Sequence, residues 1–290
     1  MEKSEVLFMD YQTLNHEKVL SILPDRKCDA HKGDFGKILL LCGSLGFTGA
    51  AALAAMGALR SGAGLVYLGV PESIYAIEAT KLNEAIVFPL PDADGKLSIQ
   101  ALPQILKMLP DMDAVLFGPG WGKSEGNFLI AKEILQSFNK PVVVDADGIN
   151  ILAKHMDIVR ERKAPTILTP HPGEFARMGG NNDIDRQAAA EDFARNHGCI
   201  LLLKGHNTVI TDGNRTYINP TGNPGMAVGG SGDVLAGIIV SLIGQGIDPL
   251  KAAACGAWLH GAAGDNCAAQ IGQYGMLPTD MVEALPRLMK

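Results

Sequence analysis

Residues 37–70, KILLLCGSLGFTGAAALAAMGALRSGAGLVYLGV, contain the pattern of a β-strand, an α-helix and a second β-strand. Residues 37–42 form a short apolar run, which is typical of a strand that is buried on both faces. Residues 50–61 are rich in alanine, the strongest helix former, and residues 65–70 are apolar again. Glycine-containing turns separate the three parts. The pattern predicts a βαβ unit with parallel strands and a right-handed crossover.

The same alternation of strands and helices continues along the chain to residue 203. Further strands are expected at 85–90, 114–117, 141–144, 166–168 and 199–203. Helices are expected at 11–23, 95–109, 127–138, 149–155, 186–197, 234–243, 250–269 and 279–288. Residues 209–211 and 216–218 are predicted to form a hairpin with a type I′-like turn at Asp212-Gly213-Asn214. We therefore predict an α/β fold, a doubly wound and mostly parallel sheet flanked by helices, with a C-terminal hairpin and helices.

The composition limits the range of functions. The net charge is −6 and no run is rich in Lys or Arg, which argues against nucleic acid or an anionic membrane as a partner. The five cysteines include no CxxC pair, which fits free thiols in a reducing compartment. We see neither a signal peptide nor a membrane span, and expect a cytoplasmic protein. One domain over residues 1–290 is expected, with residues 1–30 as an N-terminal extension.

A glycine-rich segment, Gly222-Asn-Pro-Gly-Met-Ala-Val-Gly-Gly-Ser-Gly-Asp233, precedes an apolar run from Val234 to Ile243. Glycines let a ligand approach the main chain closely. The free N–H groups and the dipole at the start of the following helix favour an anion there. A carboxylate beside an anion site can act as a base that deprotonates a hydroxyl. It can equally cap the helix, and the segment alone leaves Asp233 open between these two roles.

Glycine and acidic residues follow two expected strands at their carboxyl ends, the ligand-binding edge of an open α/β sheet. Gly118-Pro-Gly-Trp-Gly122 is either a wall for a flat ring or ribose, or a tight turn with Trp121 in the core. Asp145 and Asp147 either coordinate Mg²⁺ or cap the following helix.

Two further strand ends carry polar groups. His171 and Glu174 lie among prolines that stiffen the chain, which suits orientation of a substrate and hydrated Mg²⁺, or simply a capped loop. Lys204-Gly-His-Asn-Thr208 can meet a phosphate but is not a Walker A sequence. Four histidines without companions at ligand spacing are expected to be surface or structural: His16, His155, His197 and His260.

Seven motifs occur in an order that resembles the ADP/ATP-dependent NAD(P)H-hydrate dehydratases, a branch of the ribokinase-like superfamily. They are His31-Lys-Gly-Asp-Phe-Gly36, Gly43-Ser-Leu-Gly-Phe-Thr-Gly-Ala-Ala51, Gly118-Pro-Gly-Trp-Gly122, Val144-Asp-Ala-Asp147, Leu168-Thr-Pro-His-Pro-Gly-Glu174, Lys204-Gly-His-Asn-Thr208 and Asn219-Pro-Thr-Gly-Asn-Pro-Gly-Met-Ala-Val-Gly-Gly-Ser-Gly-Asp233. Many ribokinase-like enzymes carry Asn-x-x-Glu near the phosphates, where this chain has His171-Pro-Gly-Glu174. That departure favours the dehydratase branch.

The resemblance implies repair of the S hydrates of NADH and NADPH, with ADP expected as co-substrate rather than ATP. The hydrate hydroxyl would be phosphorylated and the phosphate then eliminated, with Asp233 as the base and Mg²⁺ bridging phosphates. The resemblance assigns catalysis to Gly230, Ser231, Gly232 and Asp233. It assigns substrate contacts to Ala50, Ala51, Gly120, Gly122, His171 and Asp233. It assigns nucleotide contacts to Lys204, Gly205, His206, Asn207, Thr208 and Gly232, and metal contacts to Glu174 and Asp145.

The expected partners are therefore the hydrated cofactor and an adenine nucleotide. A separate epimerase is expected to interconvert the R and S hydrates, and we expect a homo-oligomer. Two other functions remain open on the sequence. One is a ribokinase-like kinase acting on a hydroxymethylpyrimidine, a hydroxyethylthiazole or a sugar, and the other is a nucleotide-binding regulatory protein without catalysis.

Overall fold

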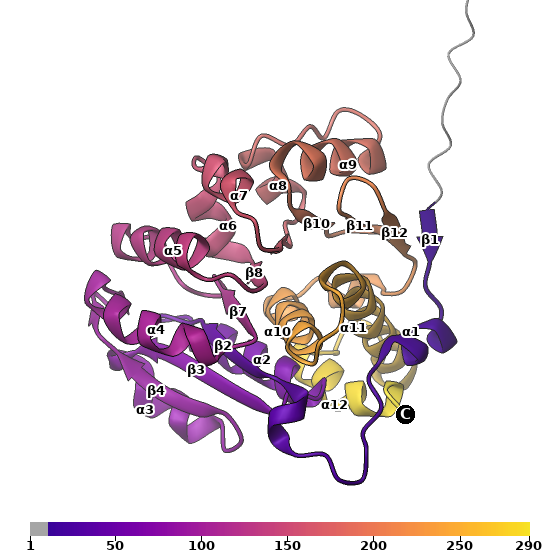
Figure 1. Ribbon diagram of the computed structural model, residues 1–290. Coiled ribbons are helices and arrows are strands. Elements are labelled where there is room, and N and C mark those ends of the chain that lie inside the picture. The colour runs from indigo at the N-terminus through magenta and orange to yellow at the C-terminus, as the bar shows by residue number, and fades with distance from the viewer. Residues whose placement is uncertain (1–10) are drawn as a thin grey trace, which may run out of the picture.

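The structure is a computed structural model that describes residues 11–290, and it is built on one ten-stranded sheet (Figure 1). The strand order is β1-β12-β11-β10-β9-β8-β7-β2-β3-β4. The strands are β1 (Tyr11–Thr13), β2 (Lys37–Leu41), β3 (Leu65–Pro71), β4 (Ile86–Leu90), β7 (Ala114–Phe117), β8 (Val142–Val144), β9 (Thr166–Leu168), β10 (Ile200–Leu203), β11 (Thr208–Thr211) and β12 (Thr216–Asn219). The pairs β10–β11 and β11–β12 are antiparallel, and the other pairs are parallel. The predicted doubly wound, mostly parallel sheet is confirmed.

Helices cover both faces of this sheet. One face carries α2 (Thr48–Arg60), α3 (Glu72–Lys81), α10 (Ser231–Gly244), α11 (Pro249–Ile271) and α12 (Pro278–Leu288). The other carries α4 (Leu102–Met108), α5 (Glu125–Ser137), α6 (Ala146–Leu152), α7 (Met156–Glu161), α8 (Pro172–Arg177) and α9 (Arg186–His197). The small hairpin of β5 (Asp92–Ala93) and β6 (Lys96–Leu97) is a separate sheet, and α1 (His16–Ile22) packs near α11. No helix within residues 11–290 is long and apolar enough to cross a bilayer.

The strand β2 supplies side chains to both cores, as its continuous apolar sequence predicts. Ile38 and Leu40 belong to the core on the α10 face, and Leu39 and Leu41 belong to the core on the α5 face. All four side chains are fully buried. Successive side chains of a strand point to opposite faces, so an unbroken apolar run is needed where helices cover both.

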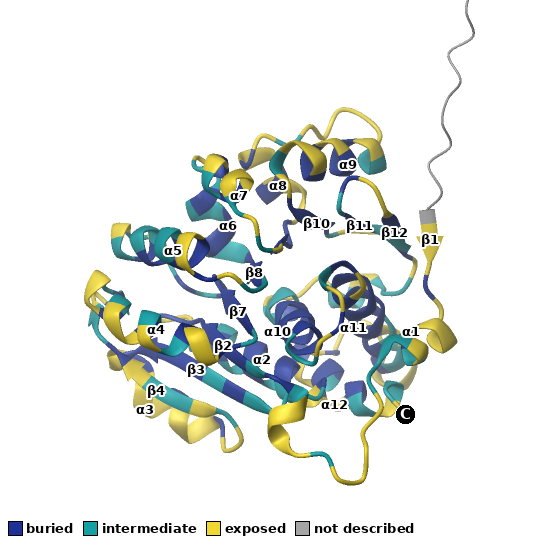
Figure 2. Cartoon of the chain, in the orientation of Figure 1, coloured by how far each residue is buried: buried dark blue, intermediate teal, exposed yellow. Residues whose placement is uncertain are grey.

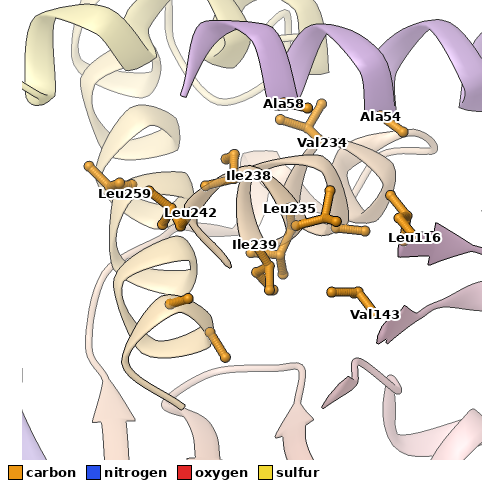
Figure 3. Packing of buried hydrophobic residues seen from close by; sticks show 14 of the residues in the cluster. Ala54, Ala58, Leu116, Val143, Val234, Leu235, Ile238, Ile239, Leu242 and Leu259 are labelled. Carbon is orange, nitrogen blue, oxygen red and sulfur yellow. The ribbon is translucent and has the colours of Figure 1, made fainter. Parts of the chain in front are cut away.

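The centre of the α10 face is a close contact between α2 and α10 (Figure 3). A Cβ built on Gly57 would lie 2.5 Å from the Val234 carbonyl oxygen, and one built on Gly237 would overlap the carbonyl of Ala54. Glycine at both positions therefore allows the helices to approach closely. Figure 2 shows most of α10 dark blue, because it packs between the sheet and the neighbouring helices.

Several predicted elements differ from the structure. Residues 11–23 are not one helix: residues 11–13 pair with β12, and Asn15 caps α1 by accepting a hydrogen bond from the Lys18 N–H. Part of the expected N-terminal extension thus joins the sheet, and its first ten residues lie outside the described part. The helix expected from residue 95 begins only at Leu102, because β6 and a 3₁₀ turn occupy residues 96–101.

The hairpin β11–β12 is confirmed, but its turn is not of type I′. That turn needs positive φ at both central residues, and only Gly213 of the loop has it. The Asp212 carboxylate instead accepts hydrogen bonds from the N–H groups of Asn214 and Arg215. The helices α3, α7 and α8 were not predicted.

Candidate active site

The loops after β2 and β7 lie side by side at the point where the strand order reverses. The strand β2 has β3 on one side and β7 on the other, and in such sheets ligands bind at this switch point. Gly43 N–H donates to the Pro119 carbonyl (2.8 Å), and the Ser44 hydroxyl donates to the Gly120 carbonyl (2.7 Å). The two predicted substrate loops therefore form one joined surface.

Two of the predicted substrate residues meet on this surface. A Cβ built on Gly120 would lie 2.7 Å from the Ala50 Cβ, so the two residues are direct neighbours. Ala51 is fully buried behind them in the core. Trp121 is also fully buried, stacked on Phe117 with 5.1 Å between ring centroids. The Trp121 side chain is therefore in the core, as the second interpretation of Gly118–Gly122 expected, and it is not available as a wall for a ligand.

Asp147 connects the loop after β7 to the loop after β8. Its Oδ2 accepts a hydrogen bond from the Gly122 N–H at 2.8 Å. The sequence offered it a role in metal binding or helix capping, and the structure shows it holding Gly122 in place.

Asp145 and Lys204 form a buried ion pair at the carboxyl ends of β8 and β10. Asp145 Oδ1 accepts hydrogen bonds from Lys204 Nζ (2.9 Å) and from the Thr169 hydroxyl (2.7 Å). Asp145 stands at the N-cap position of α6 but makes no capping hydrogen bond. Burial lowers the pKa of Lys204, but Asp145, Glu174 and Asp233 together raise it above its ordinary value. Lys204 is therefore a positive charge in the site at neutral pH.

The predicted anion site lies in the first turn of α10. Its N-cap residue is Gly230, which has a φ of 97° and no side chain that could accept a hydrogen bond from the first N–H groups of the helix. The Ser231 N–H donates to the Val228 carbonyl at 3.3 Å, a long hydrogen bond. Within the described chain the N–H groups of Gly232 and Asp233 have no acceptor. These two N–H groups are the main donors available to an anion.

Asp233 lies beside this anion site in the same turn. Burial, with a further contribution from Asp145, raises the pKa of its carboxyl to about 7, against the opposing effect of Lys204. A base is most effective when its pKa lies near the working pH. The tertiary environment therefore favours a base over a simple helix cap.

His260 is a site residue that the sequence interpretation missed. It comes from α11 and is buried, with its Nε2 3.2 Å from the Ser231 hydroxyl. Burial lowers the pKa of His260 to about 4, so the ring is neutral at physiological pH. Its partner is 29 positions away in the chain, and no local pattern could have indicated the contact.

A cavity of ≈ 680 Å³ opens beside the first turn of α10. All six predicted nucleotide-binding residues line it: Lys204, Gly205, His206, Asn207, Thr208 and Gly232. His171, which was predicted to bind substrate, lines the same cavity, and so does His260. Apolar side chains such as Leu235 and Ala257 form part of the wall. Such a mixture of an apolar surface and a few polar groups is typical of a small-molecule site.

The predicted loop at His171 and Glu174 is instead the start of α8. His171 Nδ1 accepts hydrogen bonds from the N–H groups of Gly173 (3.0 Å) and Glu174 (3.4 Å). Glu174 Oε2 accepts in return from the His171 N–H at 2.9 Å, which completes a capping box. Both residues therefore cap the start of α8, which is compatible with the predicted contacts of His171 to substrate and of Glu174 to Mg²⁺.

The fit of Mg²⁺ to this site follows from its carboxylates. Within residues 11–290, no three His, Cys, Asp or Glu side chains come together to hold a metal. Mg²⁺ often needs only one or two carboxylates when phosphate oxygens complete its shell. Asp145 Oδ2 accepts no hydrogen bond from the described residues, and Glu174 Oε1 has only a 3.5 Å contact with His171 Nε2. The site therefore fits Mg²⁺ in company with a nucleotide, not a metal held by protein alone.

Comparison with known proteins shows the family of this chain. The protein-family model of the NAD(P)H-hydrate dehydratases matches residues 38–287 of this chain. The chain belongs to this family. A bifunctional NAD(P)H-hydrate repair enzyme Nnr of Moorella thermoacetica is 46% identical over 277 residues, which are 93% of this chain and 52% of that protein. The chain thus spans about half the length of the curated relatives it matches.

Solved structures agree with the assignment to the dehydratase family. The ADP/ATP-dependent NAD(P)H-hydrate dehydratase of Bacillus subtilis, co-crystallised with ATP/Mg²⁺, is 31% identical, with a TM-score of 0.81 and 98% of each chain covered. A ribokinase-like superfamily protein of Enterococcus faecalis is 26% identical, with a TM-score of 0.85, 99% of this chain and 98% of that chain covered. This chain therefore has the ribokinase-like fold of the dehydratase family.

Proposed function

We propose that this chain dehydrates the S hydrates of NADH and NADPH at the expense of an adenine nucleotide, as a metabolite-repair enzyme. One observation carries the proposal: Asp233, with a pKa of about 7, stands in the same helical turn as the free N–H groups of the anion site. The family match favours this reaction over a small-molecule kinase. We propose ADP ahead of ATP as the nucleotide.

Asp233 takes the proton from the hydrate hydroxyl, whose oxygen then forms a bond to the terminal phosphorus of the nucleotide. The phosphoanhydride bond breaks, and ADP leaves as AMP. The N–H groups of Gly232 and Asp233 donate to the charge that develops on the transferred phosphoryl group. The C–O bond of the phosphorylated hydrate then breaks with phosphate as the leaving group. Loss of a proton from the adjacent ring carbon restores the double bond.

Lys204 and the cavity residues position the nucleotide for this transfer. The Lys204 ammonium, held by Asp145, neutralises phosphate charge without needing to move. The joined loops at Ala50 and Gly120 hold the nicotinamide end on the opposite side of Asp233. Mg²⁺ bound with the nucleotide would contact Glu174 or Asp145 and would offset phosphate charge.

The decisive experiment supplies purified protein with the S hydrate of NADH, Mg²⁺ and either ADP or ATP. The proposal expects the absorbance of reduced nicotinamide to return together with release of inorganic phosphate. A phosphorylated product without phosphate release would indicate a kinase instead. Nucleotide binding without turnover of any hydrate would indicate a regulatory protein.

The remaining expectations stand as part of the same proposal. We propose one domain over residues 1–290, a homo-oligomer, and a separate epimerase that supplies the S hydrate. Light scattering of the purified chain tests the oligomer. Turnover of the R hydrate by this chain alone would remove the need for a separate epimerase.

A further inference from the structure

A second cavity, of ≈ 610 Å³, lies outside the site described above. It is formed by the loop after β7, by residues of α5, α6 and α8, and by the connection between α6 and α7. These elements lie near one another in Figure 1. Three cations line it: Lys123, Lys154 and Arg177. Among its lining residues in the described chain there is no Asp or Glu. In a chain with a net charge of −6, this is a concentrated positive surface.

The three cations have no carboxylate partner in the structure. Among the ion pairs of residues 11–290, none includes Lys123, Lys154 or Arg177. Arg177 Nε donates to Asn150 Oδ1 at 2.7 Å, which fixes the guanidinium against α6. Like charges that converge on one pocket repel one another unless an anion joins them. A phosphomonoester dianion, with several acceptor oxygens, matches an arginine and two lysines.

Two aromatic rings form another part of the pocket. Phe128 and His155 lie with their ring centroids 4.4 Å apart, and both are half-buried. Their planes are tilted by 34°, and the partly exposed side of either ring is suited to stacking with a nucleobase. The combination of rings and cations therefore fits a nucleoside phosphate better than a bare phosphate.

The pocket adjoins the substrate side of the active site. Lys123 directly follows Gly122, whose N–H is bonded to Asp147 at the start of α6. Asn150 lies one helical turn beyond Asp147, and the seven residues of α6 rise about 10 Å. A Cβ built on Gly122 would lie 2.9 Å from the Lys96 Cε, so that cationic side chain crosses the same loop. The loop at Gly122 thus connects the substrate side of the active site with the second cavity, and Lys96 and Lys123 lie along it.

We propose that this pocket binds the adenosine end of the hydrated dinucleotide, with Lys123, Lys154 and Arg177 holding the 2′-phosphate of NADPH hydrate. The inference rests on the proposed function and assigns a specificity to it. NADH hydrate lacks that phosphate, and it leaves the three cations without an anion. The chain therefore prefers NADPH hydrate to NADH hydrate.

The test compares the double variant Lys154→Gln/Arg177→Gln with the control Arg160→Gln/Lys163→Gln. The control residues are exposed, lie outside the pocket and give the same change of charge. The pocket variant is expected to lose about tenfold in kcat/KM for NADPH hydrate, mainly through KM. The kcat/KM of the pocket variant for NADH hydrate should stay within about twofold of the wild-type value. The kcat/KM of the control variant should stay within the same range for both hydrates. Equal losses for both hydrates, or no loss for NADPH hydrate, would overturn the proposal.

A binding measurement separates this inference from the reaction itself. Calorimetry with ADP saturating the first cavity compares adenosine 2′,5′-bisphosphate with AMP. The bisphosphate should bind more tightly to the wild type and to the control, but not to the pocket variant. Equal affinities, or inorganic phosphate binding as tightly as the bisphosphate, would overturn the dinucleotide site. A wild type that turns over neither hydrate contradicts the proposed function, while the binding difference still decides what the pocket holds.

Discussion

At the scale of single residues, the environment of Asp233 decides whether its carboxylate is a cap or a base. Burial raises its pKa, and charged neighbours from the ends of two strands act on it as well: Asp145 and Asp147, after β8, raise the pKa, and Lys204, after β10, lowers it. Removal of the carboxylate charge should abolish turnover while nucleotide binding persists. Asp233→Asn is therefore expected to lower kcat by at least about a hundredfold with an unchanged ADP affinity by calorimetry. Retained turnover would contradict the role of Asp233 as the base.

The pH dependence of the reaction follows from the same group. A base must be deprotonated, so kcat/KM should rise as the pH increases through about 7, the pKa of Asp233, and level off above it. His260, with a pKa of about 4, contributes no titration in this range. A kcat/KM that does not change between pH 5 and pH 9 would show that the reaction does not depend on the ionisation of Asp233.

Stability should respond in the opposite sense to pH. The folded pKa of Asp233, about 7, lies above the ordinary value of an aspartate carboxyl, so its contribution to stability is fully present below the unfolded pKa and is lost as the pH rises through about 7. The gain in Tm from Asp233→Asn, measured by calorimetry, should thus be about 2–4 °C larger at pH 8 than at pH 5. An equal gain at both pH values would mean that the charged carboxylate is not penalised in the fold.

At the scale of elements, the contact between α2 and α10 positions the anion site against the substrate loops. Gly57→Ala should destabilise the fold by about 1–3 kcal/mol, because the new Cβ meets the Val234 carbonyl at 2.5 Å. Gly49, in the same helix, faces open space, and Gly49→Ala should stabilise by about 0.5–1 kcal/mol. Urea unfolding of both variants measures the difference. Similar values for the two would show that the helices can separate without cost.

At the scale of the whole molecule, the nucleotide cavity combines strand-end loops with α10 and α11. Asp265 of α11 holds one wall, because its carboxylate accepts hydrogen bonds from the Gly222 N–H (2.9 Å) and from Asn223 Nδ2 (3.0 Å). ADP at a hundred times its Kd should stabilise the fold by about 2.7 kcal/mol. Asp265→Ala should weaken ADP binding several-fold and reduce this thermal shift. An unchanged shift would show that the loop keeps its position without Asp265.

The sequence alone determined the alternation of strands and helices, because buried parallel strands must be continuously apolar and the intervening helices are rich in good helix formers. It also placed the polar motifs at one edge, since parallel strands end on the same side. The short helices α7 and α8 were missed, because six residues carry too little periodicity to distinguish a helix from a loop.

Only the tertiary structure decided the roles of individual side chains. Asp147 holds Gly122 and His260 supports Ser231, and each of these contacts joins residues that are distant in the chain. Trp121 is in the core because the packed fold buries it completely. The same holds for the second cavity, whose cations come from three segments that only the fold brings together. The pKa of Asp233 has the same origin: burial and neighbouring charges are properties of the packed chain, and no local sequence pattern contains them.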